Sequence, residues 1–170
     1  MSFKADRMDF WGWIGAPSLI CLGATLLFAA PIKVLGLQLP EPVFPMAPVF
    51  AWAVLRPSIL APFVLLGMGL FLDMVWGDLT GLWGLALISA YLTVLLSRSM
   101  MTGQSRVMMW VWFAVACGVA MAVAYAATAV DSGVAPNLVP TFWQFLPTVL
   151  LYPFAHRLIE RFEDADVRFR

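Results

Sequence analysis

The sequence predicts an all-α integral membrane protein whose chain crosses the bilayer six times. Of its 170 residues, 62% are hydrophobic and only 12% are charged, and the mean hydropathy is +0.89. A soluble domain is roughly half apolar and about a quarter charged, so this chain has too little polar surface to cover a soluble globule. Long apolar segments alternate with short polar or turn-forming stretches, which indicates a single polytopic domain over residues 1–170.

Four of the predicted spans are apolar runs of the roughly 20 residues that a helix needs to cross about 30 Å of hydrocarbon, a fifth (81–96) is shorter, and the second is broken by prolines. The first run follows Lys4 and Arg7 but is too long for the apolar core of a signal peptide, which has about 7–15 residues. We therefore expect a retained first span. The six spans are predicted at about residues 11–32, 43–55, 58–76, 81–96, 107–130 and 137–155.

The second span differs from the others because Pro40, Pro42, Pro45 and Pro48 occur within it or just before it. Proline lacks a backbone N–H group and disfavours helical geometry in the residue before it. Uninterrupted helix is therefore expected only over residues 49–55. We expect a proline-broken, half-unwound span that is shielded by protein rather than by lipid.

The positions of the basic residues predict that both termini lie on the cytoplasmic side. In the six-span topology, the inner segments contain nine of the ten basic residues and the outer loops contain only Lys33. An excess of lysine and arginine on the cytoplasmic side is the usual pattern of membrane proteins. A five-span topology would place the termini on opposite sides and would remove this asymmetry.

Asp73 is the acidic residue that lies inside an apolar run. A charge in the middle of a membrane helix costs about 2.5–3.5 kcal/mol on insertion scales. Three interpretations are open: a carboxylate that reaches the membrane interface, an acceptor that organises the following turn, or part of a proton or substrate relay. The turn interpretation draws on Gly77, Asp78 and Gly81, because glycine admits positive φ and aspartate bonds backbone groups in turns. A relay needs a second intramembrane ionisable group, and none is obvious.

Small residues at helical spacing indicate close contacts between helices. Gly69 and Gly84 permit such an approach near the turn, and a stripe with a spacing of four residues occurs in the fifth span. Small residues let backbones pack closely in lipid, which favours packing inside the bundle, although a docking face for another membrane protein fits the same spacing. The stripe consists of Ala114, Gly118, Ala122 and Ala126.

The inner turn between the second and third spans contains Arg56 and Pro57. An arginine at this place is an ordinary anchor on the cytoplasmic side. The alternative is a fixed turn that orients a cytoplasmic contact, because proline restricts the backbone.

The sequence contains no catalytic or metal-binding pattern that we can identify. His156 is the only histidine, and Cys21 and Cys117 lie in apolar runs as small hydrophobic residues. No HExxH motif, phosphate-binding glycine loop or Ser/His/Asp set occurs. We therefore predict no enzymatic activity, no metal and no cofactor. The formal net charge of zero gives no indication of a nucleic-acid partner.

Four segments form a pattern that covers nearly the whole chain. A proline-led stretch ends in Trp52-Ala-Val-Leu-Arg56-Pro57, and Gly69-Leu-Phe-Leu-Asp73 follows. The next segments are Leu79-Thr-Gly81-Leu-Trp-Gly84-Leu and Tyr152-Pro-Phe-Ala-His-Arg157. These are packing and turn motifs rather than catalytic ones. Together with the six spans and short termini, they resemble the MreD family of rod shape-determining proteins.

The resemblance implies a non-enzymatic scaffold in the bacterial cytoplasmic (inner) membrane that helps to position peptidoglycan synthesis and to maintain cell shape. It implies MreC as the main partner, RodA and its class B penicillin-binding protein as further partners, and MreB as an indirect partner. The turn that contains Gly77, Gly81 and Gly84, with the segment 40–48, would contact a periplasmic partner.

The resemblance also implies a fold similar to the substrate-binding subunits of energy-coupling-factor vitamin transporters. The alternative function is therefore a small-molecule (vitamin-like) binding subunit of a membrane transporter. In that case the proline-broken second span would leave backbone groups free to bind the ligand, as discontinuous helices do in transporters.

Overall fold

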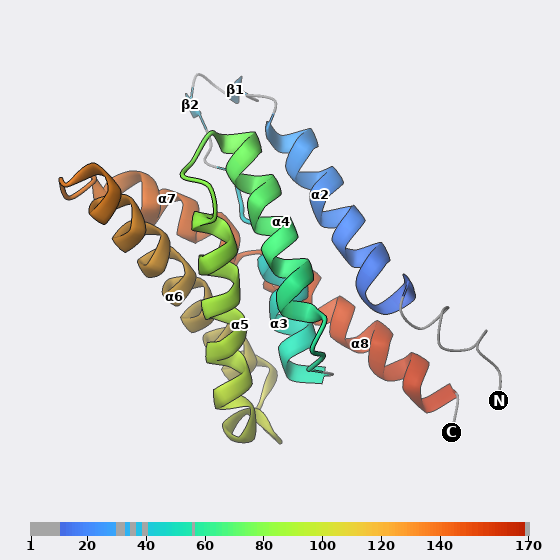
Figure 1. The fold of residues 1–170 in the computed structure, drawn as a ribbon. Helices are drawn as coiled ribbons and strands as arrows, with labels where there is room; N and C mark the ends of the chain where they lie inside the picture. Colours follow the sequence, from blue (N-terminus) through green and yellow to red (C-terminus); the bar gives the residue numbers. More distant parts are fainter. Residues whose placement is uncertain (1–10, 30–32, 35–36, 39–40, 56, 169–170) are drawn as a thin grey trace.

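The computed structural model describes residues 11–29, 33–34, 37–38, 41–55 and 57–168, which form a predominantly helical bundle (Figure 1). The prediction of a helical fold is confirmed, apart from one short antiparallel strand pair, β1 (Lys33–Val34) with β2 (Leu37–Gln38). The helical elements are η1 (Trp11–Gly15, a π-helix), α2 (Ala16–Ala29), α3 (Met46–Leu55), α4 (Ala61–Trp76), α5 (Leu82–Met101), α6 (Arg106–Ser132), α7 (Leu138–Val149) and α8 (Tyr152–Arg168).

Three helical segments are long and apolar enough to cross a membrane: Leu82–Met101, Arg106–Ser132 and Leu138–Glu160. Three further apolar helices are shorter, with 10–17 residues each. Large apolar side chains such as Leu27 and Leu96 are exposed on the surface of the bundle, at 74% and 82%. Such a surface is stable in contact with lipid, whereas soluble proteins rarely expose large contiguous apolar areas.

Helices α4, α5 and α6 run in alternating directions, so the connections between them lie at opposite ends of the bundle (Figure 1). One end contains the turn between α4 and α5, and we call it the Asp73 end. The opposite end contains the loop between α5 and α6, and we call it the Arg106 end. The start of α2 and the end of α8 lie toward the Arg106 end (Figure 1).

Helix α3 lies at the centre of the bundle, where it contacts α5, α6 and α8. Eight of its ten residues are buried. Phe50 of α3 packs edge-on against Phe113 of α6, with ring centroids 5.3 Å apart, and both rings contact Tyr152 of α8. The second predicted span is therefore shielded by protein, as expected.

The same helix is more regular than the sequence indicated. Uninterrupted helix was expected only over residues 49–55, but α3 begins at Met46 and includes Pro48. Pro48 lies in the first helical turn, where a backbone N–H has no intrahelical acceptor, so its absence costs little. The prediction of a half-unwound span is therefore wrong for residues 46–55. Pro40 lies outside the described residues.

The last predicted span is divided into α7 and α8 by a proline. Pro153 has no N–H group to donate to the carbonyl of Val149, four residues earlier, and α7 ends there. The indole N–H of Trp110 in α6 donates to this carbonyl at 3.2 Å. One residue earlier, the buried Thr148 hydroxyl accepts the N–H of Val43 at 3.1 Å. Side chains and distant backbone therefore stabilise the break.

Helices α4 and α5 cross at two glycines. A Cβ atom added to Gly69 would overlap the backbone N and Cα of Gly84 and would lie 2.6 Å from the carbonyl carbon of Trp83. A Cβ atom on Gly84 would lie 2.8 Å from Cδ1 of Leu66. By contrast, a Cβ atom added to Gly67 would have no neighbour within 4 Å. The absence of a side chain at Gly69 therefore sets the distance between the two helices.

We expect Gly69→Ala to lower the thermal unfolding midpoint of the purified protein in detergent, because the new methyl group forces two backbones apart. Overpacking of this kind costs about 1–3 kcal/mol. Gly67→Ala is the matched control, and it should leave the midpoint unchanged or raise it, since alanine favours a helix by roughly 0.5–1 kcal/mol. Equal midpoints for the two variants would contradict the close crossing.

Candidate functional site

The candidate site is the turn between α4 and α5. Asp73 lies in the last turn of α4, and it is only 3% exposed. Its two carboxylate oxygens accept separate hydrogen bonds: Oδ2 from the N–H of Gly81 at 2.7 Å, and Oδ1 from the N–H of Trp83 at 3.0 Å. The carboxylate therefore points into the turn rather than toward the surface.

Two glycines with positive φ shape this turn. Gly77 ends α4 with φ 72°, and its N–H donates to the carbonyl of Asp73 at 2.9 Å. Gly81 immediately precedes α5 with φ 93°. Residues with a Cβ atom rarely adopt this left-handed conformation. The two glycines let residues 77–81 reverse the chain and bring the first N–H groups of α5 onto the Asp73 side chain.

The Asp73 carboxylate occupies the N-terminus of α5. The first N–H groups of a helix have no intrahelical acceptor, and the helix dipole places partial positive charge there. Gly81 and Trp83 donate from this position. The buried negative charge and the otherwise unpaired donors compensate each other, which explains how a carboxylate is tolerated here with no cationic partner among the described side chains.

Two tryptophans and two further carboxylates surround the turn. The indole N–H of Trp76 donates to Oε2 of Glu41 at 2.7 Å, and the indole N–H of Trp83 donates to Oδ2 of Asp78 at 2.8 Å. The two indole rings meet edge to face, with centroids 5.0 Å apart. We call Glu41, Trp76, Asp78 and Trp83 the rim. Because Glu41 precedes α3, the rim joins the proline-led segment to the turn.

The chemistry of this arrangement is that of a rigid support. Asp73 and both rim carboxylates accept hydrogen bonds from N–H groups of the protein itself. A general base must instead reach a proton on a substrate. No group of three or more His, Cys, Asp or Glu side chains that could hold a metal occurs in the part of the chain that the structure describes. What the turn presents to its surroundings is the exposed loop of residues 77–80.

The small-residue stripe of α6 has a different orientation from the one expected. The residues of the stripe face the core only in part: Ala114 and Gly118 are half-buried, whereas Ala122 and Ala126 are exposed. A Cβ atom on Gly118 would lie 3.9 Å from the ring of Phe145 in α7. The prediction that the stripe packs inside the bundle is therefore wrong for Ala122 and Ala126. The buried face of α6 is instead formed by Phe113, Ala116, Cys117, Ala120, Met121 and Ala124.

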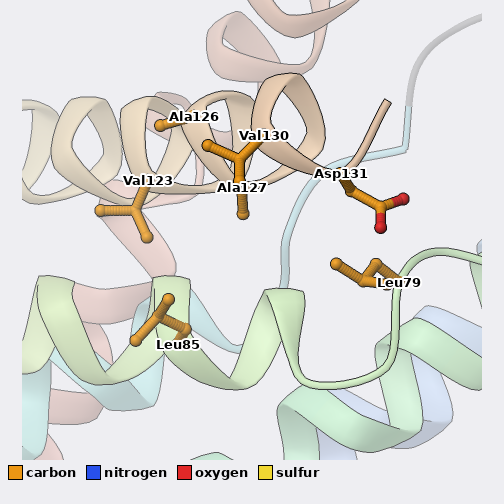
Figure 2. Close-up of a pocket in the computed structure, with 7 residues that line it drawn as sticks. All are labelled: Leu79, Leu85, Val123, Ala126, Ala127, Val130 and Asp131. Carbon is orange, nitrogen blue, oxygen red and sulfur yellow. The ribbon is translucent and has the colours of Figure 1, made fainter. Parts of the chain in front are cut away.

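An apolar groove of about 460 Å³ lies between α5 and α6 at the Asp73 end (Figure 2). Ala126 and Val130 line it from α6, and Leu85 lines it from α5. Leu79 of the turn closes one end, where the Asp131 side chain points toward it (Figure 2). The exposed half of the small-residue stripe and the turn thus share one surface, which the sequence did not indicate.

In the predicted inner turn, which lies between α3 and α4, Pro57 is exposed. Arg56, the other residue of that prediction, lies outside the described residues. Sequence reasoning also missed the roles of Glu41, Trp76 and Trp83. Each is a polar or aromatic residue close to a predicted turn, which is a weak signal. The bond between Glu41 and Trp76 joins residues 35 positions apart, and no local spacing predicts it.

Fold and site together define the class of protein: a small helical bundle with helices long and apolar enough to cross a membrane, and with a hydrogen-bonded turn at one end. Comparison of the chain with protein-family models, with curated proteins and with solved structures found no match. Function is therefore inferred from the residues and their geometry, together with the resemblance described above.

Substitutions of Asp73 should reduce stability in a graded order. Asp73→Leu removes both acceptors, whereas Asp73→Asn keeps one oxygen and turns an NH₂ group toward the other backbone N–H. Each buried donor left unsatisfied costs about 1–3 kcal/mol. We therefore expect the unfolding midpoint and membrane abundance to fall in the order wild type, Asn, Leu.

Asp78→Asn is the matched control for these variants. Asp78 accepts one hydrogen bond, from the Trp83 indole at 2.8 Å, and an amide oxygen can accept it equally well. This variant should remain close to wild type. If Asp73→Asn and Asp78→Asn have the same midpoint, the double acceptance at Asp73 is not what stabilises the turn.

Proposed function

We propose that this protein is a non-enzymatic scaffold of the bacterial elongation (rod) complex in the cytoplasmic membrane. In this proposal it binds MreC directly, with RodA and its class B penicillin-binding protein as further partners and MreB as an indirect one. The observation that carries the proposal is the turn at Asp73, where the one carboxylate inside an apolar run is engaged by two backbone N–H groups. The same residues form the centre of the pattern that resembles the MreD family.

Six membrane spans with both termini inside belong to the proposal. The alternating helices give the bundle two opposite ends (Figure 1), and in this proposal the Asp73 end is outside and the Arg106 end is inside. The basic residues support this orientation, because Arg98 and Arg106 both lie at the Arg106 end. Arginine is enriched on the cytoplasmic side of membrane proteins. Helix α3 is too short to cross the membrane in direct contact with lipid, but it need not do so, because neighbouring helices shield it.

A hydrogen-bonded turn suits a binding surface because its loop is already ordered before the partner arrives, which lowers the entropic cost of association. Leu79 of this loop is 46% exposed and borders the groove. In the same groove, Ala126 allows the close approach of another helix. A partner with one transmembrane helix and a periplasmic segment would contact the groove and the loop together.

The alternative function, a vitamin-binding subunit, depended on backbone groups freed by a broken second span. Helix α3 is continuous over residues 46–55, so this part of the chain offers no such groups. Ligand pockets also combine apolar walls with several convergent polar groups, whereas the groove between α5 and α6 has one polar side chain, Asp131. A saturable thermal stabilisation by a vitamin would restore this alternative.

Leu79→Lys tests the proposed contact surface. Placing a hydrated charge in an apolar contact should weaken co-purification of MreC by roughly tenfold or more, since tenfold corresponds to only about 1.4 kcal/mol. The control is Val134→Lys, because Val134 is 70% exposed in the loop after α6 but does not line the groove. Both variants should reach wild-type abundance in the membrane, as measured by immunoblot.

Depletion in a rod-shaped host tests the function itself. Loss of the protein should produce rounded cells, and the wild type and Val134→Lys should restore the rod shape, whereas Leu79→Lys should not. Unchanged cell shape after depletion, together with no association with MreC, would overturn the proposal.

A further inference from the structure

A second hollow, of about 410 Å³, lies at the Arg106 end, far from the turn and its groove. Its polar wall contains Arg98 from the end of α5, Gln104 from the loop between α5 and α6, Arg106 from the start of α6, and His156 from α8. Three helices and a loop therefore direct cationic or hydrogen-bonding side chains to one place.

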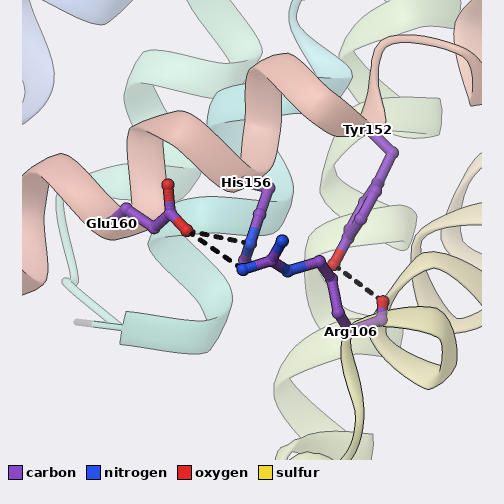
Figure 3. Close-up of polar contacts among 4 residues, drawn as sticks. All are labelled: Arg106, Tyr152, His156 and Glu160. Atoms are coloured by element: carbon purple, nitrogen blue, oxygen red, sulfur yellow. Dashed lines mark hydrogen bonds and ion pairs between the residues drawn. The ribbon is translucent and has the colours of Figure 1, made fainter.

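Among the described residues, the positive charge of this hollow is only partly balanced. Arg106 lies 3.6 Å from the carboxylate of Glu160, and Nε2 of His156 lies 3.1 Å from the same oxygen (Figure 3). Arg98 donates to the carbonyl of Leu55 at 3.4 Å. Among the described residues, one carboxylate thus serves two basic side chains, and a second arginine contacts only a neutral carbonyl. Each guanidinium has five N–H donors, so both arginines retain capacity for an anion.

The position of Arg106 favours an anion further. Arg106 is the first residue of α6, and its side chain is 73% exposed. The hydroxyl of Tyr152 donates to the Arg106 carbonyl at 3.1 Å, which holds this end of α6 against α8 (Figure 3). The N-terminus of a helix carries partial positive charge, and this charge adds to that of the two guanidinium groups.

The hollow also has an apolar wall, which includes Val54, Met109 and Ile159. A small inorganic anion would gain nothing from this wall. A phospholipid suits both the polar and the apolar wall, because its phosphate headgroup is joined to acyl chains. The hollow also lies at the ends of α5 and α6, two helices long and apolar enough to cross a membrane, which is where lipid headgroups would be found.

We propose that this hollow binds the phosphate headgroup of an anionic phospholipid, with Arg98 and Arg106 as its ligands and the apolar wall against the acyl chains. Basic pockets between helices on the cytoplasmic side are suited to such headgroups. The proposal does not depend on the scaffold function, because none of these residues belongs to the rim or to the groove.

Native mass spectrometry of the full-length protein in neutral detergent tests the proposal, with phosphatidylglycerol as the probe and phosphatidylethanolamine as the comparison. Wild type should retain phosphatidylglycerol preferentially. The double variant Arg98→Gln/Arg106→Gln should bind it more weakly, by about fivefold for each arginine removed. Arg157→Gln is the matched control, because Arg157 is exposed on α8 but does not line the hollow.

Glu160→Gln gives an independent readout that does not depend on the stability of the double variant. Removing the competing carboxylate should tighten binding of phosphatidylglycerol. An equal loss of binding in Arg157→Gln and the double variant, or no preference for the anionic lipid, would overturn the proposal. Displacement of the lipid by millimolar inorganic phosphate would also overturn it, because the site would then recognise a free anion.

Discussion

The bundle depends on the hydrogen bonds from the N–H groups of Gly81 and Trp83 to the Asp73 carboxylate. Without an acceptor, these donors would remain unsatisfied in surroundings that provide little water. With it, α4 ends and α5 begins in a fixed relation. The crossing of the same two helices at Gly69 and Gly84 then becomes possible. The Asp73 carboxylate therefore fixes how α5 begins relative to α4, and the two glycines allow the close spacing of this helix pair.

The two ends of the bundle use charge in opposite ways. At the Asp73 end, the carboxylates accept hydrogen bonds from the protein itself, and the result is a rigid surface. At the Arg106 end, Arg98 and Arg106 have fewer acceptors than donors among the described residues. Carboxylates whose hydrogen bonds are made within the protein stabilise one conformation, whereas arginine N–H groups without an acceptor favour the binding of an external anion. The first end therefore suits a protein partner and the second suits a lipid headgroup.

Proline illustrates why helix boundaries were difficult to predict. The sequence correctly indicated a shielded second span, but Pro48 falls in the first turn of α3, where it does little harm. Pro153 lies four residues after Val149, the last residue of α7, so the Val149 carbonyl has no helical donor and accepts from Trp110 instead. The effect of a proline depends on its place within the helix, and that place was set by distant contacts such as the one between Trp110 and Val149.

The sequence by itself determined the apolar helical character, the approximate positions of the helices, and the glycine-containing turn that follows Asp73. These features follow from composition, periodicity and backbone preferences, which act over a few neighbouring residues. Only the tertiary structure decided which face of α6 is buried, and which side chains meet across the fold, as Glu41 and Trp76 do. Helix rotation results from the packing of many side chains at once, and no short segment contains that information.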